Sequence, residues 1–314
     1  MKYRLLGNTG LEVSKLSFGA SSLGSVFRQT DDGEAVRTVH AALDAGINYI
    51  DVSPYYGATK AETVLGEAIR QTSRDRFYLS TKAGRYGADT FDFSRSRIES
   101  SLEESLRRLR TDYVDVLFLH DIEFVQPEVI LEEAIPALNR LKEQGKIRFT
   151  GICGLPLALF EQMLPQAQVD AIISYCHYSL NDTSLLRLLP LLDTHGVGLV
   201  NASPISMGLL STRGTPDWHP ASPEVKAACL RAAKLAEERG ADIAKLAIQF
   251  STGDERIPTT LVSTANPANI ARNAQWSDEP MDMELLNDVL EILKPVHNQT
   301  WVSGLPRYNE NLAV

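Results

Sequence analysis

The chain has 314 residues, 44% of them hydrophobic, and a formal net charge of −9. It can bury a large core, and its acidic balance argues against nucleic acid and anionic membranes as partners, because both attract basic surfaces. The sequence has no apolar run of about 18 residues, which a membrane span needs, and its N-terminus lacks the apolar core of a signal peptide. We therefore expect a cytoplasmic protein.

The three cysteines, Cys153, Cys176 and Cys229, lie far apart and form no C-x-x-C pair. An odd number without paired spacing indicates reduced thiols, and it argues against a disulfide framework or a structural zinc site. We therefore expect no metal.

The chain opens with a predicted hairpin, Tyr3–Val13, whose turn lies near Asn8 to Gly10 and which would plug the floor of the fold. Eight short apolar and β-branched runs follow, as is typical of strands buried on both faces. These runs are Leu16–Phe18, Tyr49–Asp51, Phe77–Thr81, Val114–Leu119, Ile147–Ile152, Ala171–Ser174, Val197–Asn201 and Thr260–Ser263. Each precedes a segment with helical periodicity. The predicted helices are Asp32–Ala45, Glu62–Gln71, Ser94–Leu109, Pro127–Gln144, Pro156–Leu164, Thr183–His195, Pro223–Arg239 and Pro267–Ala274.

Eight strand-then-helix units predict an α/β fold, a (β/α)8 TIM barrel, with an extra C-terminal helix at Met283–Leu293. The alternative is an open doubly wound sheet, which usually carries G-x-G-x-x-G after its first strand. The sequence there reads GASSLGS and does not fit. Because no Pro-, Gly- or Ser-rich linker divides the chain, we expect residues 1–314 to form a single domain.

Four chemically distinct side chains follow the second, third and fourth predicted strands. They are Asp51, Tyr56, Lys82 and His120. Active sites of such barrels lie at the C-terminal ends of the strands, so these groups should share one rim. Each alone has an ordinary structural explanation, such as a helix cap, a solvated charge or a packed loop aromatic. Together they suit the oxidation of an alcohol, because Lys82 can lower the pKa of a tyrosine base, Asp51 can keep that lysine charged, and His120 can orient the substrate oxygen.

At these residues the sequence resembles the aldo-keto reductase superfamily, and within it the aldose 1-dehydrogenases of the L-galactose or L-fucose type. The resemblance covers nearly the whole chain and includes NYIDVSPYYGATKAETVLGEAI, STKAGRY, DYVDVLFLHDIEF and PDWHPASPE. It implies a catalytic tetrad of Asp51, Tyr56, Lys82 and His120. It also implies a nicotinamide cofactor across the barrel mouth, and an aldose oxidised at its anomeric carbon to a lactone.

The resemblance further implies a cofactor site around the later strands. Its expected members are Ser174 and Ser203 at the nicotinamide, Leu209 and Leu210 under the pyrophosphate, and Ser263, Asn269, Arg272 and Asn273 at the adenosine ribose. Many relatives hold the carboxamide with a Ser-Asn pair and stack a tyrosine on the nicotinamide. This chain has Cys153-Gly154 and Ala202 there, and Tyr175 or Tyr178 is the expected substitute ring.

Relatives that prefer NADP carry a Lys and an Arg around the 2′-phosphate, where this chain has Ser263 and Asn269. Without those cations a 2′-phosphate loses charge-assisted hydrogen bonds worth about 1.5–3 kcal/mol each. We therefore expect NAD as the cofactor, although Arg272 lies nearby.

The sugar should meet polar groups beside the tetrad. The expected substrate residues are Ser53, Tyr55, Asp121 and Trp301, with Phe27 and Trp218 as further aromatic cover. For Asp121, helix capping is an equally good explanation. Three other functions stay open: an aldolase with Lys82 as a Schiff-base lysine, a non-catalytic cofactor-sensing subunit, and a dehydrogenase acting on pyridoxal or another carbonyl. The expected assembly is a monomer or a small homo-oligomer.

Overall fold

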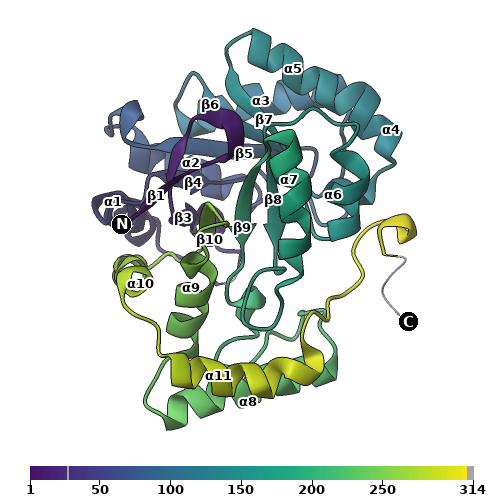
Figure 1. Cartoon of the computed structure of the whole chain (residues 1–314). Helices are drawn as coiled ribbons and strands as arrows, with labels where there is room; N and C mark the ends of the chain where they lie inside the picture. Colours follow the sequence, from purple (N-terminus) through teal and green to yellow (C-terminus); the bar gives the residue numbers. More distant parts are fainter. Residues whose placement is uncertain (27, 310–314) are drawn as a thin grey trace.

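The computed structural model describes residues 1–26 and 28–309, and in these the eight predicted strands form a closed parallel barrel (Figure 1). The barrel strands are β3 (Leu16–Gly19), β4 (Tyr49–Asp51), β5 (Tyr78–Ala83), β6 (Val114–Leu119), β7 (Ile147–Gly154), β8 (Ala171–Tyr175), β9 (Gly198–Ala202) and β10 (Thr259–Val262). They neighbour one another in chain order, and β10 closes the ring against β3. The predicted barrel is therefore confirmed.

The continuous apolar runs are explained by burial on both faces of each strand. In β6, Val116 and Phe118 pack inside the barrel, whereas Leu117 and Leu119 pack against the surrounding helices. Successive side chains of a strand point to opposite faces, so a strand with covered faces has no position for a polar residue unless that residue has a partner.

The N-terminal hairpin is also confirmed and plugs the floor as expected. Strands β1 (Tyr3–Leu5) and β2 (Glu12–Ser14) pair antiparallel, and Leu6 and Leu11 between them pack with the interior barrel residues. Gly198 begins β9 beside this plug, where a Cβ would stand 2.6 Å from Cγ of Leu6. The glycine therefore lets the plug sit directly against the strand.

Helices surround the barrel on its outer face. They are α1 (Asp32–Asp44), α2 (Lys60–Ile69), α3 (Arg95–Leu109), α4 (Pro127–Val129), α5 (Ile135–Glu143), α6 (Leu157–Met163), α7 (Leu189–His195), α9 (Ile243–Gly253) and α10 (Pro267–Asp278). A π-helical turn joins α4 to α5 just before Pro136, which lacks the backbone N–H of a regular helix. The predicted helix at Thr183–His195 is likewise divided, because α7 begins at Leu189 with Pro190 in its first turn.

The assignment of the seventh barrel helix was wrong. The predicted segment Pro223–Arg239 is helical, as α8 (Pro223–Glu238), but it packs with α11 (Met283–Leu293) in a separate apolar cluster outside the barrel. Helix α9, which was not predicted, takes the barrel position beside α10. The start of α9 could have been predicted from Asp242, because aspartate is a favoured N-cap residue. In the structure its side chain accepts from the N–H of Ala244.

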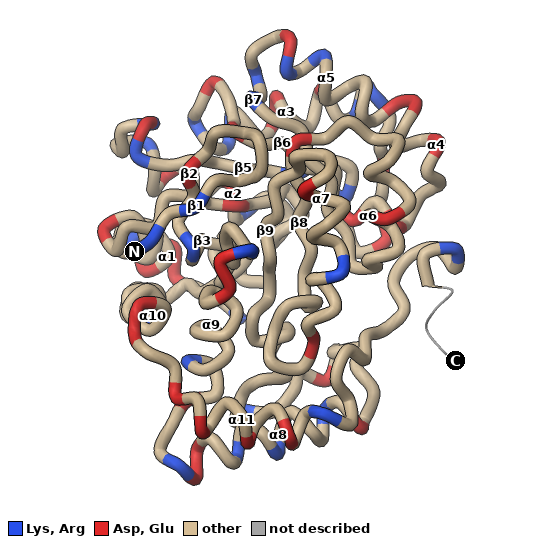
Figure 2. The backbone as a smooth tube through the Cα atoms, in the orientation of Figure 1, with Lys and Arg blue, Asp and Glu red and all other residues tan. Residues whose placement is uncertain are grey.

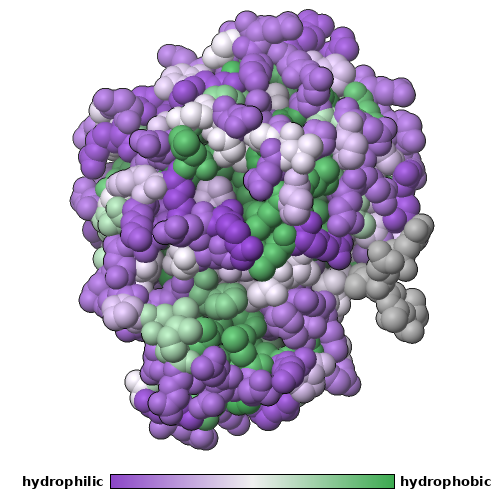
Figure 3. Space-filling view, in the orientation of Figure 1, coloured by the Kyte–Doolittle hydropathy of each residue, from purple (hydrophilic) through white to green (hydrophobic). Residues whose placement is uncertain are grey.

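The layer of α8 and α11 lies at the lower end of the molecule in Figure 1, on the opposite side from the N-terminal hairpin. Figure 3 shows apolar surface gathered between this layer and the barrel body. Charged residues of both signs are interspersed over the outer helices (Figure 2). Within the described residues, no helix combines the length and apolarity required to cross a membrane.

Candidate active site

Three neighbouring strands bring the four predicted catalytic side chains to one end of the barrel. Asp51 is the last residue of β4, Lys82 lies near the end of β5, and His120 directly follows β6. Asp51 pairs in register with Ser80, whose Oγ donates to Asp51 Oδ1 at 2.7 Å. Lys82 is two residues further along the same strand, so its side chain leaves the sheet on the same face as that of Ser80.

The Lys82 ammonium is buried and has three hydrogen-bond acceptors, which matches its three N–H donors. It donates to Asp51 Oδ2, to the carbonyl of Val52 at 3.0 Å and to Tyr56 Oη at 3.1 Å. Burial lowers the pKa of Lys82, but the Asp51 carboxylate and Tyr56 raise it by more, so the pKa lies above its usual value. The lysine is therefore held as a cation beside the phenol.

Lys82 was expected to lower the pKa of Tyr56 below its ordinary value. That expectation was wrong, because the net shift is upward. Burial raises the pKa of Tyr56, and the opposing influence of Lys82 is smaller, so the pKa lies above the ordinary value of about 10. Removing a phenolate from water costs more here than one ammonium at 3.1 Å recovers. Because Oη accepts from Lys82, its own hydrogen is free for another acceptor.

His120 is oriented from behind by the loop that follows β4. Its Nδ1 lies 3.0 Å from Ser53 Oγ, which accepts from the N–H of Tyr55 at 3.1 Å. The Ser53 hydroxyl can therefore donate to Nδ1, which leaves the imidazole proton on Nε2. Burial lowers the pKa of His120 to about 3, with Lys82 and Arg85 contributing and Asp121 opposing. The ring is thus a neutral donor at physiological pH.

Two of the predicted substrate residues, Ser53 and Tyr55, form hydrogen bonds with other side chains of the protein. Ser53 is fully buried against His120, so it orients the imidazole and does not face a substrate hydroxyl. The Tyr55 ring lies 5.8 Å from the His120 ring, and its hydroxyl accepts from Arg85 at 3.3 Å. The Arg85 guanidinium also stacks over the Tyr55 ring at 4.2 Å.

Asp121 is buried next to His120 and forms an ion pair with Arg85. It occupies the N-cap position of the 3-10 turn Ile122–Phe124, but its side chain makes no capping bond there, so helix capping does not explain it. Sequence reasoning missed Arg85, which stands three residues after Lys82 at the same rim. Because Arg85 and Asp121 follow neighbouring strands that end at this rim, an ion pair between them could have been predicted.

A second missed residue, Glu123, ties the C-terminal tail to the mouth. Its Oε1 accepts from the N–H of Leu155 at 3.2 Å and from Ser303 Oγ at 2.9 Å, and its backbone carbonyl accepts from Leu305 at 2.8 Å. Burial raises the pKa of Glu123 to about 8, with Asp121 adding to the effect. No local sequence signal pairs residues 180 positions apart.

The two tryptophans expected near the substrate both contact the imidazole of His219. Trp301 approaches this imidazole edge-on at 5.0 Å, and Trp218 stacks on it at 5.8 Å. His219 in turn contacts the carbonyl of Ser206 at 3.1 Å through Nε2. Phe27 lies outside the described residues.

The expected cofactor residues follow the next arc of the rim. Ser174 lies in β8, Ser203 directly after β9, and Ser263 directly after β10. The Oγ of Ser174 is buried and has no hydrogen-bond partner among residues 1–26 and 28–309, an arrangement that fits a site for a polar ligand group. Leu209 and Leu210 are buried in the cluster shared with α8.

The other expected cofactor residues lie on α10. Arg272 donates to Asn269 Oδ1 at 2.6 Å and stacks over the Trp276 ring at 5.0 Å, and Asn273 is half-buried. Of the two expected substitute rings, Tyr178 is occupied elsewhere, because it stacks on Phe250 and donates to Asp254. Tyr175, at the end of β8, stays a candidate.

Known proteins resemble this chain over nearly its full length. The model of the Aldo/keto reductase family matches residues 15–294. The L-galactose dehydrogenase of Arabidopsis thaliana is 48% identical, over 97% of this chain and 98% of that protein. The D-arabinose 1-dehydrogenase of Saccharomyces cerevisiae is 32% identical, over 94% and 95% respectively. The solved holo form of an aldo-keto reductase from Bacillus halodurans superposes with a TM-score of 0.78 at 27% identity, covering 96% of this chain and 98% of that one.

Proposed function

Because the chain belongs to the aldo/keto reductase family, we propose that it is an NAD-dependent aldose 1-dehydrogenase that oxidises the anomeric carbon of a sugar to a lactone. The observation that carries the proposal is the 3.1 Å hydrogen bond from Lys82 Nζ to Tyr56 Oη, with His120 beside it. The similarity to aldose dehydrogenases over nearly the full chain supports a sugar as substrate.

In the proposed mechanism Tyr56 and His120 receive the C1 hydroxyl of the sugar. The neutral imidazole donates from Nε2 to the sugar oxygen and fixes its position, while Ser53 holds the ring by Nδ1. The Tyr56 phenol first loses its proton to solvent, and the Lys82 ammonium stabilises the resulting phenolate. This phenolate then takes the hydroxyl proton of the sugar and returns to the neutral phenol. NAD, when bound, supplies the hydride acceptor. Lys82 stays charged because Asp51 remains its partner.

Ser174, Ser203, Ser263 and the α10 side chains are the residues that would hold the dinucleotide. Ser174 Oγ has an unused hydrogen-bonding capacity at the end where a carboxamide is expected. Ser263 Oγ lies in a neutral hydroxyl cluster, 2.9 Å from Ser21 Oγ and 2.7 Å from Ser22 Oγ. A ribose hydroxyl suits such a cluster, whereas a phosphate would call for cations.

We therefore predict that kcat/KM with NAD exceeds that with NADP by about tenfold or more, since one missing charge-assisted bond is worth about 1.5–3 kcal/mol. Arg272 lies nearby, but turning its side chain to a phosphate would break its contacts with Asn269 and Trp276. Steady-state rates at low concentrations of each cofactor test the prediction. Ser263→Lys should raise kcat/KM for NADP, while Ser21→Ala serves as the uncharged control. Equal efficiency of the wild type with both cofactors would refute the preference.

Asp121 is proposed to bind sugar hydroxyls beside the reacting carbon. Asp121→Ala should raise KM for the aldose by about tenfold or more, the worth of one charge-assisted hydrogen bond, and leave KM for NAD within about twofold. Asp121→Asn is the matched variant, because it keeps the shape and an acceptor while losing the ion pair with Arg85. An unchanged KM for the aldose in Asp121→Ala would remove this residue from the substrate site.

The proposed function is tested by following NADH absorbance with a panel of aldoses that includes L-galactose, L-fucose and D-arabinose, with pyridoxal alongside. We expect turnover with at least one aldose, and a lactone detectable by NMR in the same reaction. Turnover with pyridoxal alone would transfer the activity to another carbonyl class. No turnover with any of these compounds would overturn the proposal and favour a cofactor-sensing role.

A further inference from the structure

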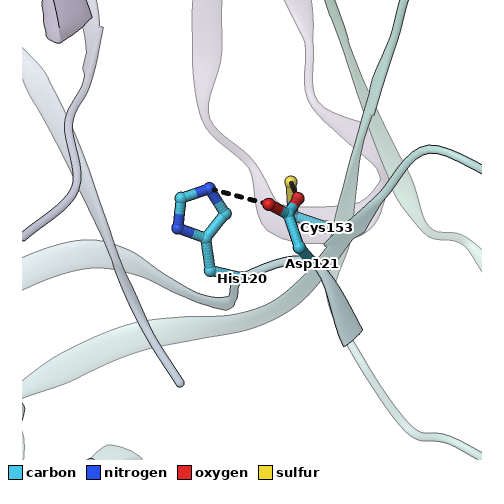
Figure 4. Close-up of side chains that lie close together, drawn as sticks. All are labelled: His120, Asp121 and Cys153. Carbon is cyan, nitrogen blue, oxygen red and sulfur yellow. Dashed lines mark hydrogen bonds and ion pairs between the residues drawn. The ribbon is translucent and has the colours of Figure 1, made fainter. Parts of the chain in front are cut away.

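We propose that the barrel mouth contains a binding site for a borderline-soft divalent metal ion, of the Zn²⁺ class, formed by His120, Asp121 and Cys153, and that the bound ion blocks the substrate position. One ligand atom from each of these residues lies within 4.8 Å of the other two. Figure 4 shows one oxygen of the Asp121 carboxylate facing the His120 imidazole and the Cys153 sulfur next to the other oxygen.

Two of the donor-atom separations are slightly wider than those of a tetrahedral zinc site. His120 Nε2 lies 3.7 Å from Asp121 Oδ2, and Cys153 Sγ lies 3.9 Å from Asp121 Oδ1. Zinc bonds of about 2.0–2.3 Å at tetrahedral angles place neighbouring ligand atoms about 3.3–3.6 Å apart. These two separations involve different oxygens of Asp121, and the three ligand atoms lie within 4.8 Å of one another, so the side chains would have to close by up to about 1.2 Å to coordinate an ion.

The three side chains stand on a rigid part of the barrel. His120 and Asp121 directly follow β6, and Cys153 lies in the neighbouring strand β7, one residue beyond the last paired positions, Leu119 and Ile152. The exposed fractions are 4% for His120, 3% for Asp121 and 2% for Cys153. Buried side chains at the ends of paired strands lose little conformational entropy when they bind an ion.

The donor set selects the class of ion. An imidazole, a carboxylate and a thiolate suit Zn²⁺ and related transition metals, whereas Mg²⁺ and Ca²⁺ prefer oxygen ligands. Three protein ligands also leave one coordination position open. The spacing of the cysteines in the sequence could not reveal this set, because its members come from two adjacent strands.

The surrounding residues support the ligands in the manner usual for metal sites. His120 Nδ1 is already bound to Ser53, which turns Nε2 toward Asp121. Arg85 fixes the Asp121 carboxylate through Oδ2. The two cations of Arg85 and Lys82 oppose the binding of a dication. The Asp121 carboxylate and the Cys153 thiolate, which forms when Cys153 loses its proton to solvent, together offset these two charges.

Occupation of the site would remove His120 Nε2 from the reaction. The ion should therefore inhibit competitively with the sugar and not with the dinucleotide. This consequence rests on the proposed function, whereas metal binding itself does not.

The test is a titration of the metal-free full-length protein, without an affinity tag, with Co²⁺ alone. We expect one equivalent to give tetrahedral d–d bands and a thiolate-to-Co²⁺ charge-transfer band, both lost on addition of Zn²⁺. In Cys153→Ser the charge-transfer band should vanish and the Kd for Zn²⁺, measured by calorimetry, should rise about tenfold or more. The matched control is Cys229→Ser, because Cys229 is a buried cysteine in α8. The Cys229→Ser variant should keep the charge-transfer band and the wild-type Kd for Zn²⁺. Titration of the wild type with Mg²⁺ should give no binding heat in the calorimeter.

Absence of the charge-transfer band in the wild type, or its persistence in Cys153→Ser, would overturn the metal site. Loss of the band in Cys229→Ser would also overturn it. If Cys153→Ser fails to fold by circular dichroism, Cys153→Ala is used with the same readouts. A protein that binds Co²⁺ as expected but oxidises no aldose would refute the proposed function and leave the metal site standing. An enzyme that oxidises an aldose but gives no charge-transfer band with Co²⁺ would refute the metal site and leave the proposed function standing.

Discussion

Replacing Tyr56 by Phe should lower kcat for aldose oxidation by about 10²–10⁴-fold, the range over which a positioned acid–base group acts. The substitution removes the hydroxyl that accepts from Lys82, while the ring keeps its edge-on packing at 5.8 Å from His120 and its position 4.8 Å from the ammonium. The Kd for NAD, measured by fluorescence titration, should stay within about twofold because the ring remains. A Tyr56→Phe enzyme with the wild-type kcat would refute the assignment of Tyr56 as the catalytic base.

The pH profile distinguishes this role from a merely structural one. The pKa of Tyr56 lies above its ordinary value, so the phenolate fraction should grow about tenfold per pH unit through the neutral range. The oxidative kcat/KM of the wild type should therefore rise with pH from about 6 to 9 without a plateau. His120, with a pKa of about 3, should add no inflection near pH 6.5. The residual activity of Tyr56→Phe should be independent of pH over this range.

Replacing Lys82 by Met should have the largest effect on stability. Methionine keeps most of the side-chain volume but leaves the Asp51 carboxylate buried without its cation. Breaking a buried ion pair from one side costs about 3–5 kcal/mol. The free energy of unfolding, from denaturant titration monitored by circular dichroism, should fall by this amount. Turnover should fall as well, because Tyr56 loses the ammonium that stabilises its phenolate.

The double variant Asp51→Leu with Lys82→Met provides the control. Replacing both members of a buried pair by apolar residues of similar volume is often neutral or stabilising, so the double variant should recover most of the lost stability. Activity should not return, because the cation is still missing. If the free energy of unfolding of the single Lys82→Met variant lies within about 1 kcal/mol of the wild-type value, the buried ion pair would be contradicted.

The sequence by itself determined the barrel and the meeting of the tetrad. A strand covered on both faces has to be apolar except where a polar residue has a partner, so the run VDVLFL predicted β6, and its Asp115 is paired with Arg74 and Arg148. Parallel strands end on the same rim, so residues that follow successive strands had to converge, as Asp51, Lys82 and His120 do. These properties depend on periodicity and chain order, both of which a sequence contains.

The tertiary structure alone decided how each group is held. Ser53 orients His120, and Arg85 takes the Asp121 carboxylate, because loops from different strands meet at the mouth. Glu123 anchors Ser303 across 180 positions of chain. The sign of the pKa shift of Tyr56 also came from the structure, since it depends on how much water burial removes relative to one nearby ammonium. Burial and side-chain partners are long-range properties, and no local pattern encodes them.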